Sequence, residues 1–313
     1  MTLPDLVCDY LAYRRALGAR MKGEGFMLRA FCKSVAGSSP SAPTADQVRN
    51  YLHHGCVSPQ TVAKRHRALS GFYRYLATRH GIELPPLPRA PKSSTTTFVP
   101  YIYSHEEIRR LLQAAPVACQ NPLALLDADT LRTVLLLLYG AGLRLGEAIR
   151  LDVSDVGLDA ALLTVRQTKF FKTRLVPLGK DLVRVMIDYR QCCDRPPTPG
   201  AKHPFFRMRN GERIEQFAVE RTFRLLRKIA QVSRHGGARR QPRLHDLRHA
   251  AAVHRLIAWY RRGADLQYLL PRLATYLGHK DLSGTQHYLT LTPPLLQEAS
   301  KRFERYAGGC HHG

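Results

Sequence analysis

Side chains that can bind and transfer a phosphate group are spread along the chain from position 144 onward. They are Arg144 in Gly-Ala-Gly-Leu-Arg-Leu-Gly-Glu, Lys169 in Gln-Thr-Lys-Phe-Phe-Lys, His245 and Arg248 in His-Asp-Leu-Arg-His, His279 in Tyr-Leu-Gly-His-Lys, and Tyr288 in Thr-Gln-His-Tyr. Arginine binds two phosphate oxygens through its planar guanidinium and keeps its charge. Lysine or histidine can donate a proton, and a tyrosine hydroxyl can act as a nucleophile. The set indicates phosphoryl transfer on nucleic acid, by chemistry that needs no metal and no nucleotide cofactor.

The charge of the chain indicates the same kind of partner. The 313 residues carry a formal net charge of +24, with a pI near 10.2. Residues 1–92 hold 14 Lys and Arg against 5 Asp and Glu, and the remainder holds 34 against 19. A polyanion that contacts both halves explains this distribution. A generically basic ribosomal or membrane-surface protein is the alternative, but the low-complexity lysine runs of ribosomal tails are missing from the sequence.

Several classes of protein do not fit the sequence. Its seven cysteines form no Cys-x-x-Cys pair, so neither a zinc site nor a disulfide framework is expected. Asp5 and Asp9 fall where a signal peptide would need an apolar core. The longest apolar run, residues 134–143, is about half as long as a membrane span. We expect a cytoplasmic, nucleoid-associated protein with no membrane contact.

The elements that must position these residues begin with a small helical domain over residues 1–82. Apolar residues recur at helical spacing, Thr44 is expected to cap one helix, and Ser58-Pro59 to open another. This last helix carries four cations beside its apolar face: Lys64, Arg65, Arg67 and Arg74. Contact with a DNA backbone and an ordinary solvated face are comparably good explanations for them. Residues 83–100, rich in proline and then polar, are expected to form an extended linker.

Residues 101–292 are expected to form a second domain, mostly helical with a small sheet. Ser104-x-x-Glu107 is a capping box. A long helix is expected around residues 131–139, and two short strands, residues 162–165 and 175–178, flank a turn at Phe170-Phe171. Further helices are expected at residues 182–186 and 217–229. Residues 293–313 are expected to add a C-terminal helix and a tail.

These motifs together resemble the tyrosine recombinase, or phage integrase, family. The resemblance covers most of the chain, and Tyr288 follows His279 by nine positions, as in the family. It implies a mainly α fold: a helical, SAM-like core-binding domain followed by a catalytic domain of the DNA breaking-rejoining fold with a small antiparallel sheet. Extra residues between Arg248 and His279, around 259–262 and 267–272, look more like recombinases of transposons and other mobile elements than like Xer-type sequences.

The resemblance also implies roles. Arg144 and Arg248 would bind the non-bridging phosphate oxygens, where charge accumulates during attack. His245 and His279 would donate hydrogen bonds to the phosphate or help to move the tyrosine proton. Glu147 would orient a cation or cap the local network. His249, His254 and His287 are interpreted as structural or surface residues.

Two roles leave alternatives open. Lys169 would be the general acid, with Lys172 as the alternative, because Phe170-Phe171 replaces the family's glycine-rich turn. Tyr288 would be the nucleophile, forming a 3′-phosphotyrosine and a free 5′-hydroxyl. Tyr276 and Tyr306 are the alternative tyrosines; Tyr276 is expected to pack in a helix core.

The sequence therefore predicts a site-specific recombinase that integrates, excises or transposes a mobile element without cofactors. It would act on double-stranded DNA as a tetramer on two sites, with other recombinases or DNA-bending helpers as further partners. By resemblance, the C-terminal helix would dock on a neighbouring protomer. The alternatives are a type IB topoisomerase-like enzyme, a catalytically silent DNA-binding accessory protein, and a basic RNA-binding protein.

Overall fold

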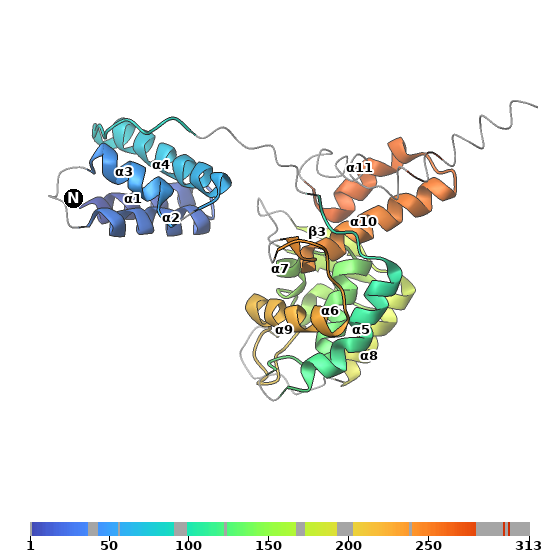
Figure 1. Ribbon diagram of the computed structural model, residues 1–313. Helices are drawn as coiled ribbons and strands as arrows, with labels where there is room; N and C mark the ends of the chain where they lie inside the picture. Colours follow the sequence, from blue (N-terminus) through green and yellow to red (C-terminus); the bar gives the residue numbers. More distant parts are fainter. Residues whose placement is uncertain are drawn as a thin grey trace, which may run out of the picture. The chain divides into compact units, whose positions relative to one another are not determined.

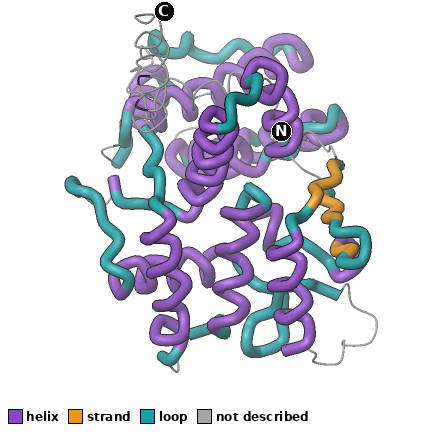
Figure 2. The backbone as a smooth tube through the Cα atoms, turned by 90° about the vertical axis from the view of Figure 1, so that its right-hand side faces the viewer, coloured by secondary structure: helices purple, strands orange, loops and turns teal. Residues whose placement is uncertain are grey.

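The chain divides into two compact units, residues 1–98 and 99–313 (Figure 1). The structure, a computed structural model, describes residues 2–36, 43–55, 57–90, 99–121, 124–166, 173–192, 203–237, 240–279, and the single positions 297 and 300. Among the described residues, helices dominate and the strands gather in one small region (Figure 2). The predicted mainly helical fold with a small antiparallel sheet is confirmed.

The described part of the first unit is a bundle of helices: α1 (Leu3–Ala16), α2 (Lys22–Val35), α3 (Ala45–His53) and α4 (Pro59–His80). Two predicted helix starts are confirmed, since Thr44 caps α3 and Ser58 caps α4, with Pro59 in the first turn of α4. Fully buried side chains of α2 and α4, among them Phe31 and Phe72, form the core. The bundle therefore fixes which face of α4 is left for solvent.

The segment after α4 does not leave the first unit at once. Ile82, Leu84 and Leu87 pack against the core of the bundle, and the Nε2 atom of His66 lies 2.8 Å from the carbonyl oxygen of Pro88. Residues 81–90 form no helix or strand, and the apolar side chains bind this stretch to the bundle. Residues 91–98 of the predicted linker lie outside the described residues.

The second unit is built around α6 (Ala128–Gly140), which packs against α5 (His105–Cys119), α8 (Lys180–Cys192) and α10 (Leu244–Arg261). Helix α9 (Gln216–Ile229) covers α5, while α7 (Leu145–Ala148) follows α6 and α11 (Leu266–Leu277) follows α10. The predicted Ser104–Glu107 capping box is present at α5. Because α6 is buried on several sides, its end holds the segment around Arg144 in a fixed place.

A three-stranded antiparallel sheet lies beside the helices, in the order β1 (Val156–Gly157), β2 (Leu162–Val165), β3 (Arg174–Pro177). Strands β2 and β3 form the predicted hairpin, and its last pair joins Val165 to Arg174. Residues 167–172, with the predicted turn at Phe170-Phe171, lie outside the described residues. The hairpin thus brings both flanks of the segment that contains Lys169 and Lys172 to one end of the sheet.

Within the described part of the chain, no helix combines the length and apolar character needed to cross a membrane. The predicted C-terminal helix, residues 293–313, falls outside the described residues except for Gln297 and Ser300, which are helical.

Candidate active site

The carboxylate of Glu147 is the centre of a cluster of arginines. Glu147 is 5% exposed and lies in α7. Arg144 donates to its Oε1 atom from Nη1 at 2.8 Å and to Oε2 from the backbone nitrogen at 3.0 Å. Arg174 donates from Nη1 to Oε1 at 3.1 Å and from Nη2 to Oε2 at 2.9 Å. One buried carboxylate therefore orients two guanidinium groups.

Glu147 is ionised at neutral pH although it is buried. Burial by itself raises the pKa of its carboxyl. The hydrogen bonds and charge of Arg174, together with the bonds from Arg144, outweigh burial and lower this pKa to about 2. The negative charge is therefore available to hold the arginines over the whole physiological range.

Arg144 stands at the junction between α6 and α7. It is the N-cap residue of α7, and its Nη2 atom donates to the carbonyl oxygen of Gly278 at 3.1 Å. Its side chain keeps 34% exposure. A guanidinium that is oriented by Glu147 and yet accessible can bind an incoming phosphate oxygen.

Arg248 is almost fully buried, with 1% exposure, on α10. Its Nη1 atom donates to the carbonyl oxygen of Gly142 at 2.7 Å, and its Nη2 atom donates to that of Leu277. Its Nη1 atom also lies 3.9 Å from Oε2 of Glu147. These contacts bring the ends of α6, α7 and α11 together around one charge.

Two glycines permit this close approach. Gly142 and Gly278 have φ values of +60° and +68°, a conformation that favours glycine. A Cβ atom on Gly142 would lie 2.6 Å from the side chain of Leu277. A Cβ atom on Gly278 would lie 2.7 Å from Nη1 of Arg174. The second glycine of the Gly-Ala-Gly-Leu-Arg motif and the glycine of the Leu-Gly-His motif are thus explained by packing at the site.

His245 and His249 lie one turn apart on α10, with ring centroids 4.6 Å apart and nearly perpendicular planes. His245 is in part exposed, but partial burial of the ring lowers its pKa, and the charges of Arg248 and Arg144 lower it further. Burial, followed by the charges of His245 and Arg248, lowers the pKa of His249 to about 3. Both rings are neutral at neutral pH, so each can donate one hydrogen bond and accept another.

His279 directly follows the end of α11. Gly278 is the C-cap residue in the left-handed conformation, and the backbone nitrogen of His279 donates to the carbonyl oxygen of Ala274 at 2.9 Å. The charge of His279 also contributes to the lowered pKa of His249. The structure therefore brings Arg144, Glu147, His245, Arg248 and His279 into one region.

Three predicted site residues cannot be placed in this region. Lys169, Lys172 and Tyr288 lie outside the described residues, as do His287 and Tyr306. Tyr276, the other alternative tyrosine, is half-buried on α11, packs against the core, and its hydroxyl donates to the carbonyl oxygen of Pro177 at 3.3 Å. Burial raises the pKa of its phenol. These contacts give Tyr276 a packing role.

The sequence analysis assigned no role to Arg174 or Asp246, and it interpreted His249, which packs against His245, as a structural or surface residue. Asp246 is 1% exposed and caps α10 by accepting from the backbone nitrogen of Arg243 at 2.9 Å. The signal that could have found it is its place three residues after Arg243 at a helix start. His254, by contrast, is structural, as interpreted, because its Nδ1 atom lies 2.8 Å from the Tyr139 hydroxyl and its ring stacks on His105.

The four cations predicted to contact DNA do not share one environment. Lys64, Arg67 and Arg74 are exposed and line a hollow of about 600 Å³ on one side of α4, together with Tyr10 and Gly71. Arg65 is half-buried, and its Nη1 atom donates to the carbonyl oxygens of Tyr51, Leu52 and His54 at 2.7, 3.3 and 3.0 Å. Arg65 therefore closes the C-terminal end of α3.

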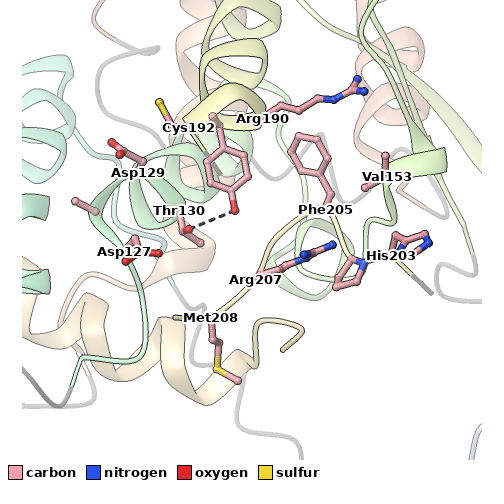
Figure 3. A pocket seen from close by; sticks show the side chains of 13 residues that line it. Asp127, Asp129, Thr130, Val153, Arg190, Cys192, His203, Phe205, Arg207 and Met208 are labelled. Atoms are coloured by element: carbon pink, nitrogen blue, oxygen red, sulfur yellow. Dashed lines mark hydrogen bonds between the residues drawn. The ribbon is translucent and has the colours of Figure 1, made fainter. Parts of the chain in front are cut away.

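A second cavity of about 600 Å³ lies at the N-terminal end of α6, the opposite end from Arg144 (Figure 3). Tyr189 and Phe205 line it, and the hydroxyls of Tyr189 and Thr130 lie 3.3 Å apart. None of the predicted catalytic residues lines this cavity. Among the described side chains, no group of three or more His, Cys, Asp or Glu is arranged to hold a metal ion.

Comparisons with known proteins agree with the fold and show the family. The sequence profile of the phage integrase family matches residues 102–293. The integrase/recombinase homologue y4rB of Sinorhizobium fredii is 36% identical over 97% of this chain and 98% of its own length. The tyrosine recombinase XerA of Pyrococcus furiosus is 28% identical over 87% of this chain and 85% of its own length.

Solved structures of the same fold include a lambda integrase tetramer bound to a Holliday junction, with a TM-score of 0.65 and 18% identity over 92% of this chain and 77% of that one. The Tn1549 transposon integrase in complex with transposon right end DNA has a TM-score of 0.64 and 16% identity, over 98% of this chain and all of that one. The fold and the basic, histidine-containing site define an enzyme of the DNA breaking and rejoining class. The chain belongs to the phage integrase family and is a site-specific tyrosine recombinase.

Proposed function

We propose that this enzyme cleaves and rejoins double-stranded DNA through a 3′-phosphotyrosine on Tyr288. The observation that carries the proposal is that Arg144, His245, Arg248 and His279 lie in one region, with Arg144 and Arg248 beside the buried carboxylate of Glu147. Fixed donors in such an arrangement stabilise the negative charge that develops on a phosphate under attack. A structural arginine cluster would not need the neutral ring of His245 beside it.

In the proposed cleavage step, the Tyr288 hydroxyl oxygen attacks the phosphorus and the bond from phosphorus to the 5′-oxygen breaks. Arg144 and Arg248 bind the two non-bridging oxygens. His245, whose ring is neutral at neutral pH, or His279 accepts the phenolic proton. Lys169 gives a proton to the departing 5′-oxygen. Attack by a 5′-hydroxyl on the phosphotyrosine reverses the step, so rejoining requires no ATP.

The partners proposed for the chain follow from its charge and its relatives. The lambda integrase structure is a tetramer on a Holliday junction, and the Tn1549 integrase structure contains a transposon end. We assign to this chain a homotetramer on two DNA sites, assembled in the cytoplasm at the nucleoid, that integrates, excises or transposes a mobile element. Other recombinases and DNA-bending proteins are proposed helpers.

Both units are proposed to contact DNA. Residues 1–82 would be a core-binding domain, in which Lys64, Arg67 and Arg74 contact the phosphate backbone from the exposed side of α4. Arg65 is omitted from this set because its guanidinium is committed to the carbonyl groups at the end of α3. Residues 101–292 would be the catalytic domain.

The test is covalent capture on DNA. A nicked suicide duplex taken from the sequence that flanks the gene traps a cleavage intermediate, because the short released fragment, which carries the free 5′-hydroxyl, dissociates after cleavage. We expect a protein–DNA adduct that resists SDS, is sensitive to protease, and disappears with Tyr288→Phe. Tight binding of the native chain without an adduct on any flanking site would instead favour a DNA-binding accessory protein.

A further inference from the structure

Arg174 makes more contacts to the site than its place at a strand start requires. It is the first residue of β3, and its side chain is 12% exposed. Two of its nitrogens bind the two oxygens of Glu147, at 3.1 and 2.9 Å. Its Nε atom donates to the carbonyl oxygen of Tyr276 at 3.2 Å. Its guanidinium is therefore held by two separate partners in a fixed plane.

These contacts join three segments that are distant in the sequence. Glu147 also binds Arg144, so the first contact leads to α7. Tyr276 lies in the last turn of α11, three residues before His279. Arg174 itself follows residues 167–172, the segment that contains Lys169, and is paired with Val165 across the hairpin. Arg174 thus contacts Glu147 on α7 and the end of α11, and it follows the segment of Lys169 in the sequence. Of the segments that carry a described or proposed catalytic group, only α10 and the segment of Tyr288 have neither relation to it.

The end of α11 is shaped to receive this guanidinium. Gly278 has a left-handed backbone, and a Cβ atom there would come within 2.7 Å of Nη1 and 2.9 Å of Cζ of Arg174. The carbonyl oxygen of the same glycine accepts a hydrogen bond from Arg144. Arg174 and Arg144 therefore bracket Gly278, and a shift of either one moves the backbone that precedes His279.

We propose that Arg174 is a positioning residue for phosphoryl transfer, which couples the β2–β3 hairpin to Arg144 through Glu147 and to His279 through the end of α11. The proposal rests on the proposed function. Arg174 need not touch the phosphate, since its nitrogens are directed at Glu147 and Tyr276. Its effect is to fix the relative places of the residues that do.

The variants Arg174→Gln and Arg174→Lys test this role, and Arg166→Gln is the matched control. Arg166 flanks the other end of the same interstrand segment and is ion-paired with Asp155, which is not part of the site. Three quantities are measured: the single-turnover rate of adduct formation on saturating suicide duplex, the Kd for that duplex, and amide hydrogen exchange at residues 274–279. Circular dichroism establishes that each variant is folded.

We expect Arg174→Gln to slow adduct formation by about 10- to 100-fold, as loss of an orienting partner does elsewhere. Its Kd should stay within about twofold of the native value, because the proposed phosphate-binding residues remain. Exchange at Gly278 and His279 should become faster. Arg174→Lys keeps the charge but lacks the planar fork, so it should also be slow. Arg166→Gln should behave as the native chain in all three measurements.

Native adduct formation by both Arg174 variants would overturn the proposal, as would unchanged exchange at residues 274–279. If the native chain itself forms no adduct, the proposed function fails instead. The exchange measurement then decides separately whether Arg174 holds the end of α11, since it does not depend on catalysis.

Discussion

At the residue scale, replacing Lys169 and replacing Lys172 should have different effects on the rate of DNA cleavage. If Lys169 is the general acid, Lys169→Ala should slow cleavage by about 100- to 10,000-fold, because the 5′-oxygen then leaves without a proton. A duplex with sulfur in place of that 5′-oxygen has a leaving group of much lower pKa. Single-turnover cleavage of this duplex should be nearly as fast with Lys169→Ala as with the native chain.

Lys172→Ala is the matched control for that prediction. It should cleave the ordinary duplex at close to the native rate and gain nothing specific from the sulfur substitution. Recovery by sulfur in Lys172→Ala, but not in Lys169→Ala, would reverse the assignment of the general acid.

Glu147 gives a second prediction, which concerns stability and pH. Its pKa is lowered from 4.5 to about 2 in the folded chain. A carboxyl whose pKa is lower in the folded than in the unfolded chain stabilises the fold fully at pH values above its unfolded pKa. This stabilisation is lost as the pH falls toward the pKa of the folded chain. The contribution is about 3 kcal/mol at neutral pH. Glu147→Gln should therefore be destabilised at pH 7, and the difference from the native chain should shrink between about pH 4.5 and 2.

Chemical denaturation at about pH 7, 5 and 3 measures this difference across the window in which the carboxyl titrates. The control is Glu106→Gln, which removes an exposed carboxylate paired with Arg109 at the start of α5. An exposed pair contributes little, so this variant should differ little from the native chain at any of these pH values. A constant deficit for Glu147→Gln from neutral to acid pH would contradict the prediction.

At the scale of elements, Gly278 offers a test of the backbone at the end of α11. Gly278→Ala places a Cβ atom against Arg174 and also strains a left-handed backbone with φ of +68°. Gly263→Ala is the matched control, since Gly263 has φ of +72° but a Cβ atom there would meet no described atom within 4 Å. Both variants should lose about 1 kcal/mol from backbone strain.

Only Gly278→Ala should also lose cleavage activity, because it displaces Arg174 and the backbone before His279. Thermal unfolding and single-turnover adduct formation separate the two effects. Equal cleavage rates for the two alanine variants would show that the contact between Gly278 and Arg174 has no bearing on catalysis.

The elements also show which features the sequence could predict. Helix starts at Thr44, Ser58 and Ser104 were predictable because capping depends on residues within one turn. Strand β1 was missed because two residues carry no alternation pattern. Helix α11 was indicated only at Tyr276, which was expected to pack in a helix core, and Pro271 interrupts the helical pattern before that residue.

The candidate site shows the same division. Motifs identified Arg144, His245, Arg248 and His279 because each lies in a short, ordered pattern. The pairing of Arg174 with Glu147 spans 27 residues, and nothing in local spacing indicates which arginine a buried carboxylate will bind. Arg65 differs from its three basic neighbours because it binds carbonyl groups at the end of α3. The composition of α4 alone could not reveal this difference, since it depends on where α3 ends in space.

At the scale of the whole molecule, the net charge of +24 should make binding to any duplex strongly dependent on salt. Each phosphate that a cation neutralises releases a counterion, so log K falls with log salt by about 0.9 per contact. If Lys64, Arg67 and Arg74 all contact the backbone, replacing the three with glutamine should reduce that slope by about three. The measurement is a titration of the full chain with a duplex of unrelated sequence at several salt concentrations.

Arg65→Gln is the contrasting variant, because it removes the same charge from the same helix. Its guanidinium is engaged by the carbonyl groups at the end of α3, so its loss should lower the Tm and leave the salt slope unchanged. If Arg65→Gln reduces the slope by about one, a third of the effect expected for the triple replacement, diffuse charge governs binding. If the salt slope is reduced by the triple replacement but not by Arg65→Gln, the duplex lies on the exposed side of α4 that Lys64, Arg67 and Arg74 share.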